Sequence, residues 1–169
     1  MNGNQQQLIF SLGGNETATE SCFTKSLELL SLRFGIPTHL SSVFCTEAWG
    51  FASSAPEFLN QIVVFNSSED PFDILSFSQQ IEKSLGRKNK SISKIYTNRS
   101  IDIDILFYGT ITIQTKNLSI PHPLLHERNF ILEPLNEILP NFLHPTLKKT
   151  VKELLLSTQD NSTVKVYKK

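Results

Sequence analysis

The chain has 169 residues, and 39% of them are hydrophobic, which is enough to build one packed core and excludes a wholly disordered protein. Sixteen Lys and Arg balance sixteen Asp and Glu, so the formal net charge is zero. Proteins that bind polyanions non-specifically normally carry a basic excess, and any basic patch here must be local. We expect a single domain over residues 1–158 and a polar, weakly packed C-terminal tail over 159–169.

The chain shows no sign of export or of a membrane span. Its two cysteines, Cys22 and Cys45, have no metal-binding spacing and are typical of thiols in a reducing compartment. Residues 1–7 are polar without a basic region, and the apolar run 8–12 is too short for a signal peptide or a membrane helix. We expect a cytoplasmic protein that does not contact a membrane.

The first half of the chain predicts three strands and one helix. The apolar run 8–12 stops at a Gly-Gly-Asn turn, which indicates a buried strand. Apolar residues then recur at helical spacing over 23–34, and the glycine that follows is typical of a helix end. Two further strands are predicted at 39–46 and 58–65, on either side of a loop at 47–57.

The second half begins with a helix over 70–85, because Asp-Pro is a favoured helix start and apolar spacing continues to a closing glycine. A basic loop over 87–99 precedes a strand at 101–108 and a short strand at 111–114, and beyond Pro121 short helices are interrupted by prolines. The order strand, helix, strand, strand, helix, strand is the ferredoxin-like βαββαβ arrangement. It predicts an α+β fold with a mainly antiparallel sheet, helices on one of its faces, and a C-terminal helical tail.

The stretch Ile-Asp-Ile-Asp-Ile at 101–105 is the most informative part of the chain. Side chains alternate along a strand, so the isoleucines share one face while Asp102 and Asp104 share the other, with α-carbons roughly 6.5–7 Å apart. Two like charges at that spacing repel, and divalent cations such as magnesium relieve the repulsion while binding phosphates. Exposed alternation on an outer strand face would produce the same pattern.

Five cations lie within thirteen residues directly before this carboxylate pair: Arg87, Lys88, Lys90, Lys94 and Arg99. Cations beside a metal-binding acid pair suit phosphoryl transfer, because they neutralise charge on the transferring and leaving groups. A solvated loop explains the same run. The Gly-Gly-Asn turn lacks the ending of a P-loop, and His122, between two prolines, has no partner at zinc-ligand spacing.

Taken together, these features resemble the 6-hydroxymethyl-7,8-dihydropterin pyrophosphokinase family. The resemblance runs from Leu8 to about Leu155. Its marks are RSIDIDILF at 99–107 followed by Gly109, IPHP at 120–123, ERNF at 127–130, Gly14-Asn15, FLN at 58–60, QIE at 80–82, and Gly86-Arg87. It implies a ferredoxin-like fold and transfer of the diphosphoryl group of ATP to the hydroxymethyl oxygen of the pterin, which releases AMP, in folate biosynthesis.

The resemblance also implies roles for individual residues. Asp102 and Asp104 would hold two magnesium ions and, with the cations of the basic loop, form the catalytic set: Asp102, Asp104, Arg99, Lys94 and Arg87. The ATP site would be formed by Gln79, Glu82, Tyr96, Ile105, Ser119, His122 and Arg128.

The pterin, a flat polar ring, would lie between Phe58 and Phe130, where stacking contributes apolar contact and an amide distinguishes the heterocycle. The full pterin set implied is Asn15, Thr46, Glu47, Ala48, Trp49, Phe58, Asn60 and Phe130. Phenylalanines are more often core residues than stacking surfaces, so the pair alone would not predict a slot. The expected partners are the pterin and ATP, the expected acting unit is a monomer, and no nucleic acid is expected.

Two other functions remain open from the residues. A ferredoxin-like module that stacks RNA bases on its sheet would share the fold, although the chain has no RNP1-like motif and its aspartates would repel phosphates. Tight, steeply salt-dependent binding of single-stranded RNA would favour that module. A different metal-dependent nucleotidyl or phosphoryl transferase would share the aspartates and basic loop, and would release ADP or pyrophosphate instead of AMP.

Overall fold

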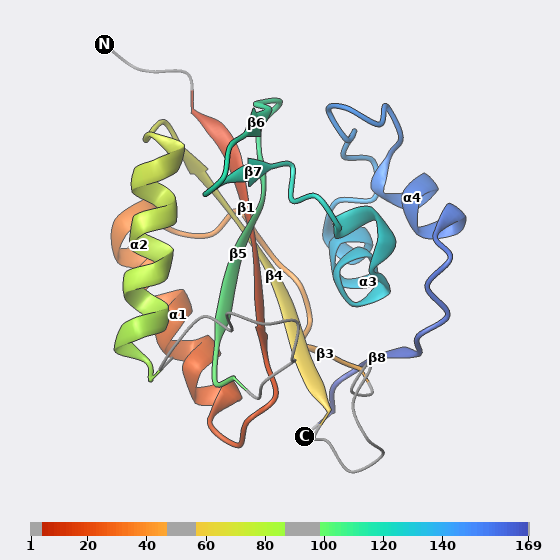
Figure 1. Cartoon of the computed structure of the whole chain (residues 1–169). Coiled ribbons are helices and arrows are strands. Elements are labelled where there is room, and N and C mark those ends of the chain that lie inside the picture. Colours follow the sequence, from red (N-terminus) through yellow and green to blue (C-terminus); the bar gives the residue numbers. More distant parts are fainter. Residues whose placement is uncertain (1–4, 47–56, 87–98, 169) are drawn as a thin grey trace.

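A computed structural model describes residues 5–46, 57–86 and 99–168. An antiparallel sheet lies between two pairs of helices (Figure 1). Helices α1 (Thr19–Phe34) and α2 (Pro71–Ser84) cover one face, and α3 (Asn129–Ile138) and α4 (Val151–Ser157) cover the other. None of the described helices is long and apolar enough to cross a membrane.

The main sheet has the strand order β5-β1-β4-β3-β8, and β2 also pairs with β4. All of these pairings are antiparallel. The first four strands of that order, with α1 and α2, reproduce the ferredoxin-like arrangement and confirm the predicted fold class. The strands are β1 (Gln6–Gly14), β2 (His39–Leu40), β3 (Phe44–Thr46), β4 (Phe58–Ser67), β5 (Asp102–Tyr108) and β8 (Val164–Val166).

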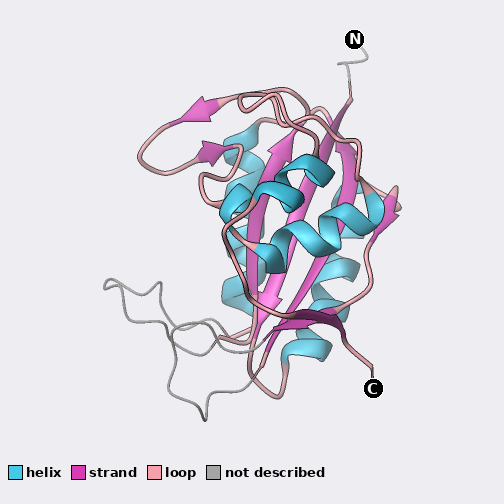
Figure 2. Cartoon of the chain, turned by 90° about the vertical axis from the view of Figure 1, so that its right-hand side faces the viewer, coloured by secondary structure: helices cyan, strands magenta, loops and turns pink. Residues whose placement is uncertain are grey.

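A second, two-stranded sheet is formed by β6 (Ile113–Gln114) and β7 (Ser119–Ile120). The short strand predicted at 111–114 is therefore present, but it pairs with β7 and not with the main sheet. From β7 the chain passes through a short 3-10 helix, η1 (Leu125–Glu127), into α3. In Figure 2, α3 and α4 lie in front of the main sheet.

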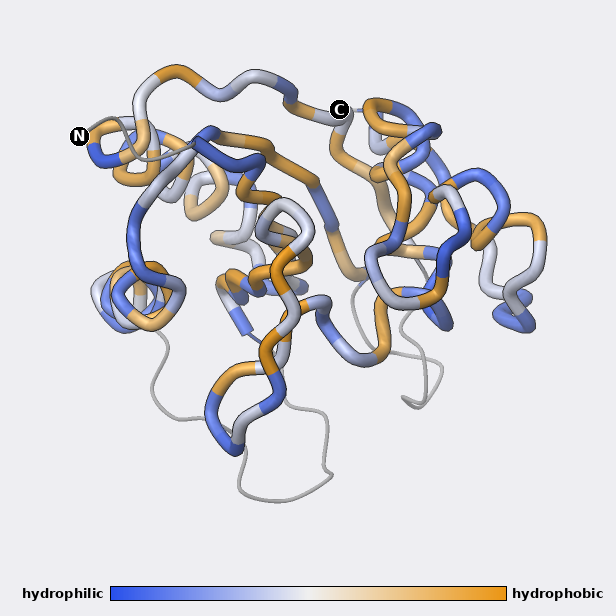
Figure 3. Tube along the Cα trace, turned by 90° about the horizontal axis from the view of Figure 1, so that it is seen from above, coloured by the Kyte–Doolittle hydropathy of each residue, from blue (hydrophilic) through white to orange (hydrophobic). Residues whose placement is uncertain are grey.

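The sheet carries a hydrophobic core on each face. On β1, Leu8, Phe10 and Leu12 pack with α1 and α2, whereas Ile9 packs with α3 and α4. A continuous apolar run is typical of a strand buried on both faces, because either face exposed would leave apolar area in water. The expectation that helices cover one face only was therefore wrong. The helices themselves show hydrophobic and hydrophilic stretches around their turns, as one-sided burial requires (Figure 3).

The predicted helix ends are confirmed. The carboxylate of Asp70 accepts a hydrogen bond from the Phe72 N–H at 2.8 Å, and Pro71 occupies the first helical position of α2. Gly35 ends α1 with φ 85°, a backbone conformation that favours glycine.

The strand predicted at 39–46 is divided into β2 and β3. Leu40 pairs with Val63 and Phe44 with Asn60, so four steps along this segment oppose three along β4. The extra residue lies within 41–43, where the Ser41 N–H donates to the Ile62 carbonyl at 2.9 Å and the Ser41 hydroxyl accepts from the Ile62 N–H at 2.9 Å.

The C-terminal tail is part of the sheet. Val164–Val166 form β8, which pairs with β3, and the Tyr167 N–H donates to the Val43 carbonyl at 2.8 Å. The expectation that this polar segment packs weakly was wrong. Backbone pairing to an edge strand requires no apolar side chains, so the tail's composition carried no signal of it.

Truncating the α3 side of the core should destabilise the fold. Leu132 is fully buried, and Leu132→Ala is expected to lower the free energy of unfolding by about 2–5 kcal/mol in urea titrations. Leu32, 84% exposed on α1, is the matched control, and its replacement by Ala should change stability by about 0.5 kcal/mol or less. Equal effects of the two substitutions would contradict this assignment of the core.

Candidate active site

The side chains at the start of β5 alternate between the two faces of the sheet, as the sequence predicted. Ile103 and Ile105 are buried against α1 and α2, and Asp102 and Asp104 are half-buried on the opposite face. The pairing shifts between Ile9, which opposes Phe107, and Phe10, which opposes Ile105. Leu106 is the extra residue of this bulge, and Leu106 and Phe107 both join the core beneath α3.

The two carboxylates line a cavity of about 340 Å³ between the sheet and α3. Several of the side chains that the resemblance assigned to the pterin and to phosphates line the same cavity. Strand β4 contributes Phe58 and Asn60, β3 contributes Thr46, and the start of α3 contributes Arg128 and Phe130. The described lining comprises Ser11, Gly13, Thr46, Phe58, Asn60, Arg99, Asp102, Asp104, Leu124, Glu127, Arg128, Phe130, Ile131 and Asp160.

The amide of Asn60 is the most informative group in this cavity. The residue is 4% exposed, and its Nδ2 has no hydrogen-bond partner among the described residues. An unpaired buried donor costs about 1–3 kcal/mol, so such groups commonly serve a ligand. A Cβ on Gly13 would lie 3.3 Å from Asn60 Oδ1, so the glycine leaves room for this amide. The cavity therefore offers a buried amide to a polar ligand.

Aromatic and cationic groups stand together at the start of α3. The Arg128 guanidinium carbon lies 5.6 Å from the centroid of the Phe130 ring, within the range of a cation–π contact. Both side chains line the cavity, as does Phe58, which is half-buried at the start of β4. The cavity thus has apolar ring surfaces and a positive charge beside the carboxylates.

Arg99, which also lines the cavity, is held by Asp102 and Asn15. Its side-chain Nη1 pairs with Asp102 Oδ2. Its backbone N–H donates to Asn15 Oδ1 at 2.9 Å, and the backbone N–H of Asn15 donates to the Arg99 carbonyl at 3.0 Å. A Cβ on Gly14 would lie 2.6 Å from the Ser100 carbonyl oxygen, so the last residue of β1 must be a glycine. Asn15 therefore braces Arg99, and its predicted pterin contact remains a prediction.

His122 lies close enough to Arg128 and Asp102 for their charges to affect the pKa of its imidazole. Burial and, to a smaller extent, the Arg128 charge lower its pKa from 6.5 to about 4, against an opposing effect of the Asp102 charge. The imidazole is therefore neutral near pH 7. Its Nδ1 accepts from the Leu124 N–H at 3.3 Å, which leaves Nε2 as the protonated, donating nitrogen.

The other predicted ATP residues that the structure describes lie on β5 and on α2 and β7, two elements that contact it. Glu82 is buried on α2, and its Oε1 accepts from the Ile103 N–H at 2.8 Å, so that N–H points away from β1. Because backbone direction repeats every two residues, the N–H and C=O of Ile105 point to the same outer edge. The Ile105 side chain is in the core, so any ligand contact is through its backbone. Gln79 is half-buried on α2, and Ser119 begins β7.

The donor set fits magnesium. Asp102 and Asp104 supply hard carboxylate oxygens, and the described residues contain no group of three or more His, Cys, Asp or Glu that could hold a metal. Magnesium is commonly bound through one or two carboxylates plus substrate phosphates and water, so a pair suffices when a nucleotide completes the shell.

Six predicted site residues lie outside the described residues, namely Glu47, Ala48, Trp49, Arg87, Lys94 and Tyr96. In the other direction, sequence reasoning missed Asp160 and Glu127 as cavity residues. Glu127 belongs to the motif ERNF at 127–130, and its place beside Arg128 and Phe130 could have indicated that it lines the cavity. Asp160 belongs to the segment taken for a tail, and its sequence carried no signal.

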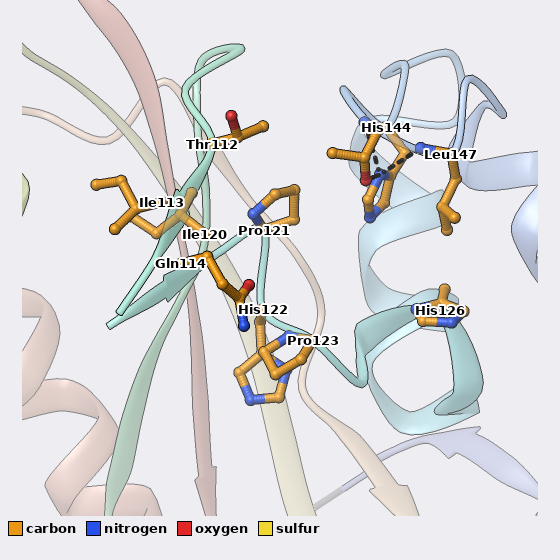
Figure 4. A pocket seen from close by; sticks show the side chains of 11 residues that line it. Thr112, Ile113, Gln114, Ile120, Pro121, His122, Pro123, His126, His144 and Leu147 are labelled. Carbon is orange, nitrogen blue, oxygen red and sulfur yellow. Dashed lines mark hydrogen bonds between the residues drawn. The ribbon is translucent and has the colours of Figure 1, made fainter. Parts of the chain in front are cut away.

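A second cavity, of about 350 Å³, lies between the β6–β7 pair and the loop before α4. Figure 4 shows His126 and His144 on one side of it and Ile113 and Gln114 on the other. His144 Nδ1 accepts from the N–H of Leu147 at 3.2 Å, so its lone pair is engaged in the turn and Nε2 carries the proton. In this state the ring has no free lone pair for a metal, and no carboxylate is among the described residues lining the cavity.

Comparisons with known proteins agree with the geometry. A family model described as 7,8-dihydro-6-hydroxymethylpterin-pyrophosphokinase (HPPK) matches residues 9–140. Relatives named 2-amino-4-hydroxy-6-hydroxymethyldihydropteridine pyrophosphokinase include one from Porphyromonas gingivalis, 42% identical over 139 residues that span 82% of this chain and 93% of the relative. Another, from Aquifex aeolicus, is 38% identical over 146 residues, which are 86% of this chain and 88% of the relative.

A solved structure, Plasmodium falciparum HPPK-DHPS with pteroate, superposes with a TM-score of 0.72 over 92% of this chain at 17% identity, which shows the fold alone. This chain spans 43% of that longer protein. Fold, cavity and relatives together define a pyrophosphokinase built on a ferredoxin-like sheet. The chain belongs to the 7,8-dihydro-6-hydroxymethylpterin-pyrophosphokinase family, an enzyme family of folate biosynthesis.

The buried His144 should make stability depend on pH. Burial, with a smaller effect of His126, lowers its pKa from 6.5 to about 4, so the unfolded chain binds more protons between those values. The contribution of neutral His144 to the free energy of unfolding is fully present above pH 6.5. It is lost as the pH drops toward 4, by about 2 kcal/mol between pH 7 and pH 5. Urea titrations should show a smaller pH-dependent loss for His144→Asn, whose amide oxygen can accept the same bonds. The exposed His39→Asn is the control, and an unchanged loss in His144→Asn would contradict the assignment.

Proposed function

We propose that the cavity beneath α3 is the site where a pterin and the phosphates of ATP meet. The chain is an HPPK, a diphosphotransferase that uses ATP as co-substrate. In the proposed arrangement Phe58 and Phe130 hold the pterin ring between them, and Asn60 pairs with its polar edge. Arg99 and Arg128 receive the phosphates, together with the magnesium ions that Asp102 and Asp104 would hold.

The observation that carries this proposal is Asn60 Nδ2, which is buried without a hydrogen-bond partner among the described residues, in a cavity that also contains the carboxylate pair. A buried amide carries both donors and an acceptor, which suits the mixed donor and acceptor edge of a pterin. Apolar ring faces beside it favour a flat ligand through burial and stacking. A ring bound there would present its hydroxymethyl oxygen within the same cavity as Asp102 and Asp104.

The reaction requires the hydroxymethyl oxygen to attack the β-phosphorus of ATP, so that the β,γ-diphosphoryl group is transferred and AMP leaves. Catalysis then consists of holding the two reactants in line and neutralising phosphate charge. Arg99, braced by Asn15, and Arg128, at the start of α3, both line the cavity and supply positive charge there. His122 can donate through Nε2 to a phosphate oxygen without adding charge of its own.

Two magnesium ions complete the proposal. Asp102 and Asp104 would hold them, and the ions would supply charge neutralisation at the phosphate oxygens and polarise the attacking hydroxyl. The adenine would bind at the outer edge of β5, where the Ile105 backbone could pair with a heterocycle, with Gln79 and Ser119 contributed by α2 and β7, which contact that strand.

The RNA-binding alternative is disfavoured by the way the sheet is covered. Modules that stack bases use an open sheet face, whereas α3 and α4 pack on the face that carries Asp102 and Asp104. We further propose that one chain acts alone and that it works in the cytoplasm, where the free thiols Cys22 and Cys45 remain reduced.

Replacing Asp104 should abolish turnover. Asp104→Ala removes one carboxylate of the pair, and AMP formation from ATP, magnesium and the hydroxymethyl dihydropterin should fall more than tenfold. Asp73→Ala, an exposed carboxylate on α2, is the matched control and should retain full activity. Retention of more than a tenth of the wild-type rate by Asp104→Ala would rule out its assigned role.

Replacing Phe130 should weaken pterin binding. By analogy with base–aromatic stacking, Phe130→Ala is expected to lose roughly 1–3 kcal/mol of pterin affinity in equilibrium titrations. Phe72→Ala, 46% exposed on α2, is the control and should bind the pterin normally. Wild-type affinity in the Phe130 variant would remove this residue from the site.

A further inference from the structure

The C-terminal segment closes one side of the proposed pterin cavity. The family model ends at residue 140, whereas Asp160 lies beyond it and lines the cavity with Phe58 and Phe130. Its position is set by β8, which pairs with β3, the strand that carries Thr46. A residue outside the matched region therefore reaches the site through the sheet edge.

Asp160 makes a pair of contacts to the first residue of α3. Its Oδ2 accepts from the Asn129 N–H at 2.7 Å, and its backbone carbonyl accepts from Asn129 Nδ2 at 2.6 Å. Its Oδ1 accepts from the Ser162 N–H at 2.8 Å, so both carboxylate oxygens are engaged by backbone donors. The backbone donors of Asn129 and Ser162 lower the pKa of Asp160, whereas burial opposes that shift.

Helix α3 needs such a contact because it lacks a cap of its own. Arg128 stands at the N-cap position and makes no side-chain capping bond among the described residues. The first N–H groups of a helix have no partner within the helix, and a carboxylate there also interacts favourably with the helix dipole. A helix cap normally comes from a Ser, Thr, Asn or Asp directly before the helix, whereas here the capping carboxylate belongs to Asp160, 31 residues further along the chain.

The remainder of the segment is anchored independently of Asp160. Besides the β8 pairing, the Tyr167 hydroxyl donates to Glu20 Oε1 on α1 at 3.0 Å. The segment is thus tied to the opposite side of the molecule from α3. This makes Asp160 a link between a fixed sheet edge and the helix end that carries Arg128 and Phe130.

We propose that Asp160 is a positioning residue for pterin binding, acting by fixing the start of α3 and, through it, the Phe130 ring. This inference rests on the proposed function, which places Phe130 against the pterin. Asn129 lies between Arg128 and Phe130, so its two bonds to Asp160 hold the segment in which both cavity side chains are rooted. A ring wall that must lie parallel to a flat ligand tolerates little rotation of the helix that bears it.

The test compares Asp160→Ala with a matched carboxylate variant. Glu153→Ala removes a carboxylate that accepts from the Thr150 N–H at the start of α4, a helix whose described residues do not line this cavity. Both variants are expected to lower Tm. Asp160→Ala should raise the Kd for the hydroxymethyl dihydropterin about tenfold in the full-length protein, as expected for losing one cap from the folded site, whereas Glu153→Ala should leave it unchanged. A Kd for Asp160→Ala within about twofold of the wild type, or an equal rise in Glu153→Ala, would overturn the inference.

A double-mutant cycle with Phe130→Ala separates positioning from direct contact. If Asp160 acts through Phe130, the double variant should bind the pterin no more weakly than Phe130→Ala alone, whereas independent contacts would add. Additive losses would therefore overturn the positioning role. An unchanged Kd in Phe130→Ala would instead show that the proposed pterin slot itself is wrong, and this outcome is distinguishable from failure of Asp160→Ala alone.

Discussion

The placement of the site depends on the burial of the isoleucines of β5. Ile101, Ile103 and Ile105 are sealed against α1 and α2, so the alternating aspartates have to face the other side of the sheet. A one-residue slip of this strand would bury two carboxylates and expose three isoleucines, which the hydrophobic effect opposes strongly. The orientation of Asp102 and Asp104 is therefore set by the neighbouring isoleucines, which take no part in the chemistry.

Around that strand, the cavity is assembled from segments that share no local sequence. Gly13 and Asn60 meet because β1 and β4 pair in register, with Gly13 directly opposite Asn60. Phe130 and Arg128 arrive on α3, which packs on the sheet through a separate core. The result places the Asn60 amide, whose Nδ2 has no partner in the described part of the chain, and aromatic surfaces beside the carboxylate pair. An acceptor ring and a phosphate donor require these two different environments side by side, and the packing of α3 on the sheet supplies both.

Local patterns predicted the elements wherever local forces decide them. The alternation at 101–105, the helix start at Asp70 and the glycine after α1 are confirmed because they follow from burial, capping and backbone freedom. The division of 39–46 and the docking of β8 were missed. In both cases the decisive bonds join backbone or hydroxyl groups distant in sequence, such as Ser41 with Ile62 and Val43 with Tyr167, and such bonds leave no periodic trace.

The sequence by itself determined the ferredoxin-like order of elements, the family, and the face on which Asp102 and Asp104 lie, because hydrophobic periodicity and short motifs are local properties. Only the tertiary structure decided that both faces of the sheet are covered, that Asn15 braces Arg99, and that Asp160 caps α3. Those features depend on which distant groups satisfy one another's hydrogen bonds once the chain is packed, and a linear pattern does not contain that information.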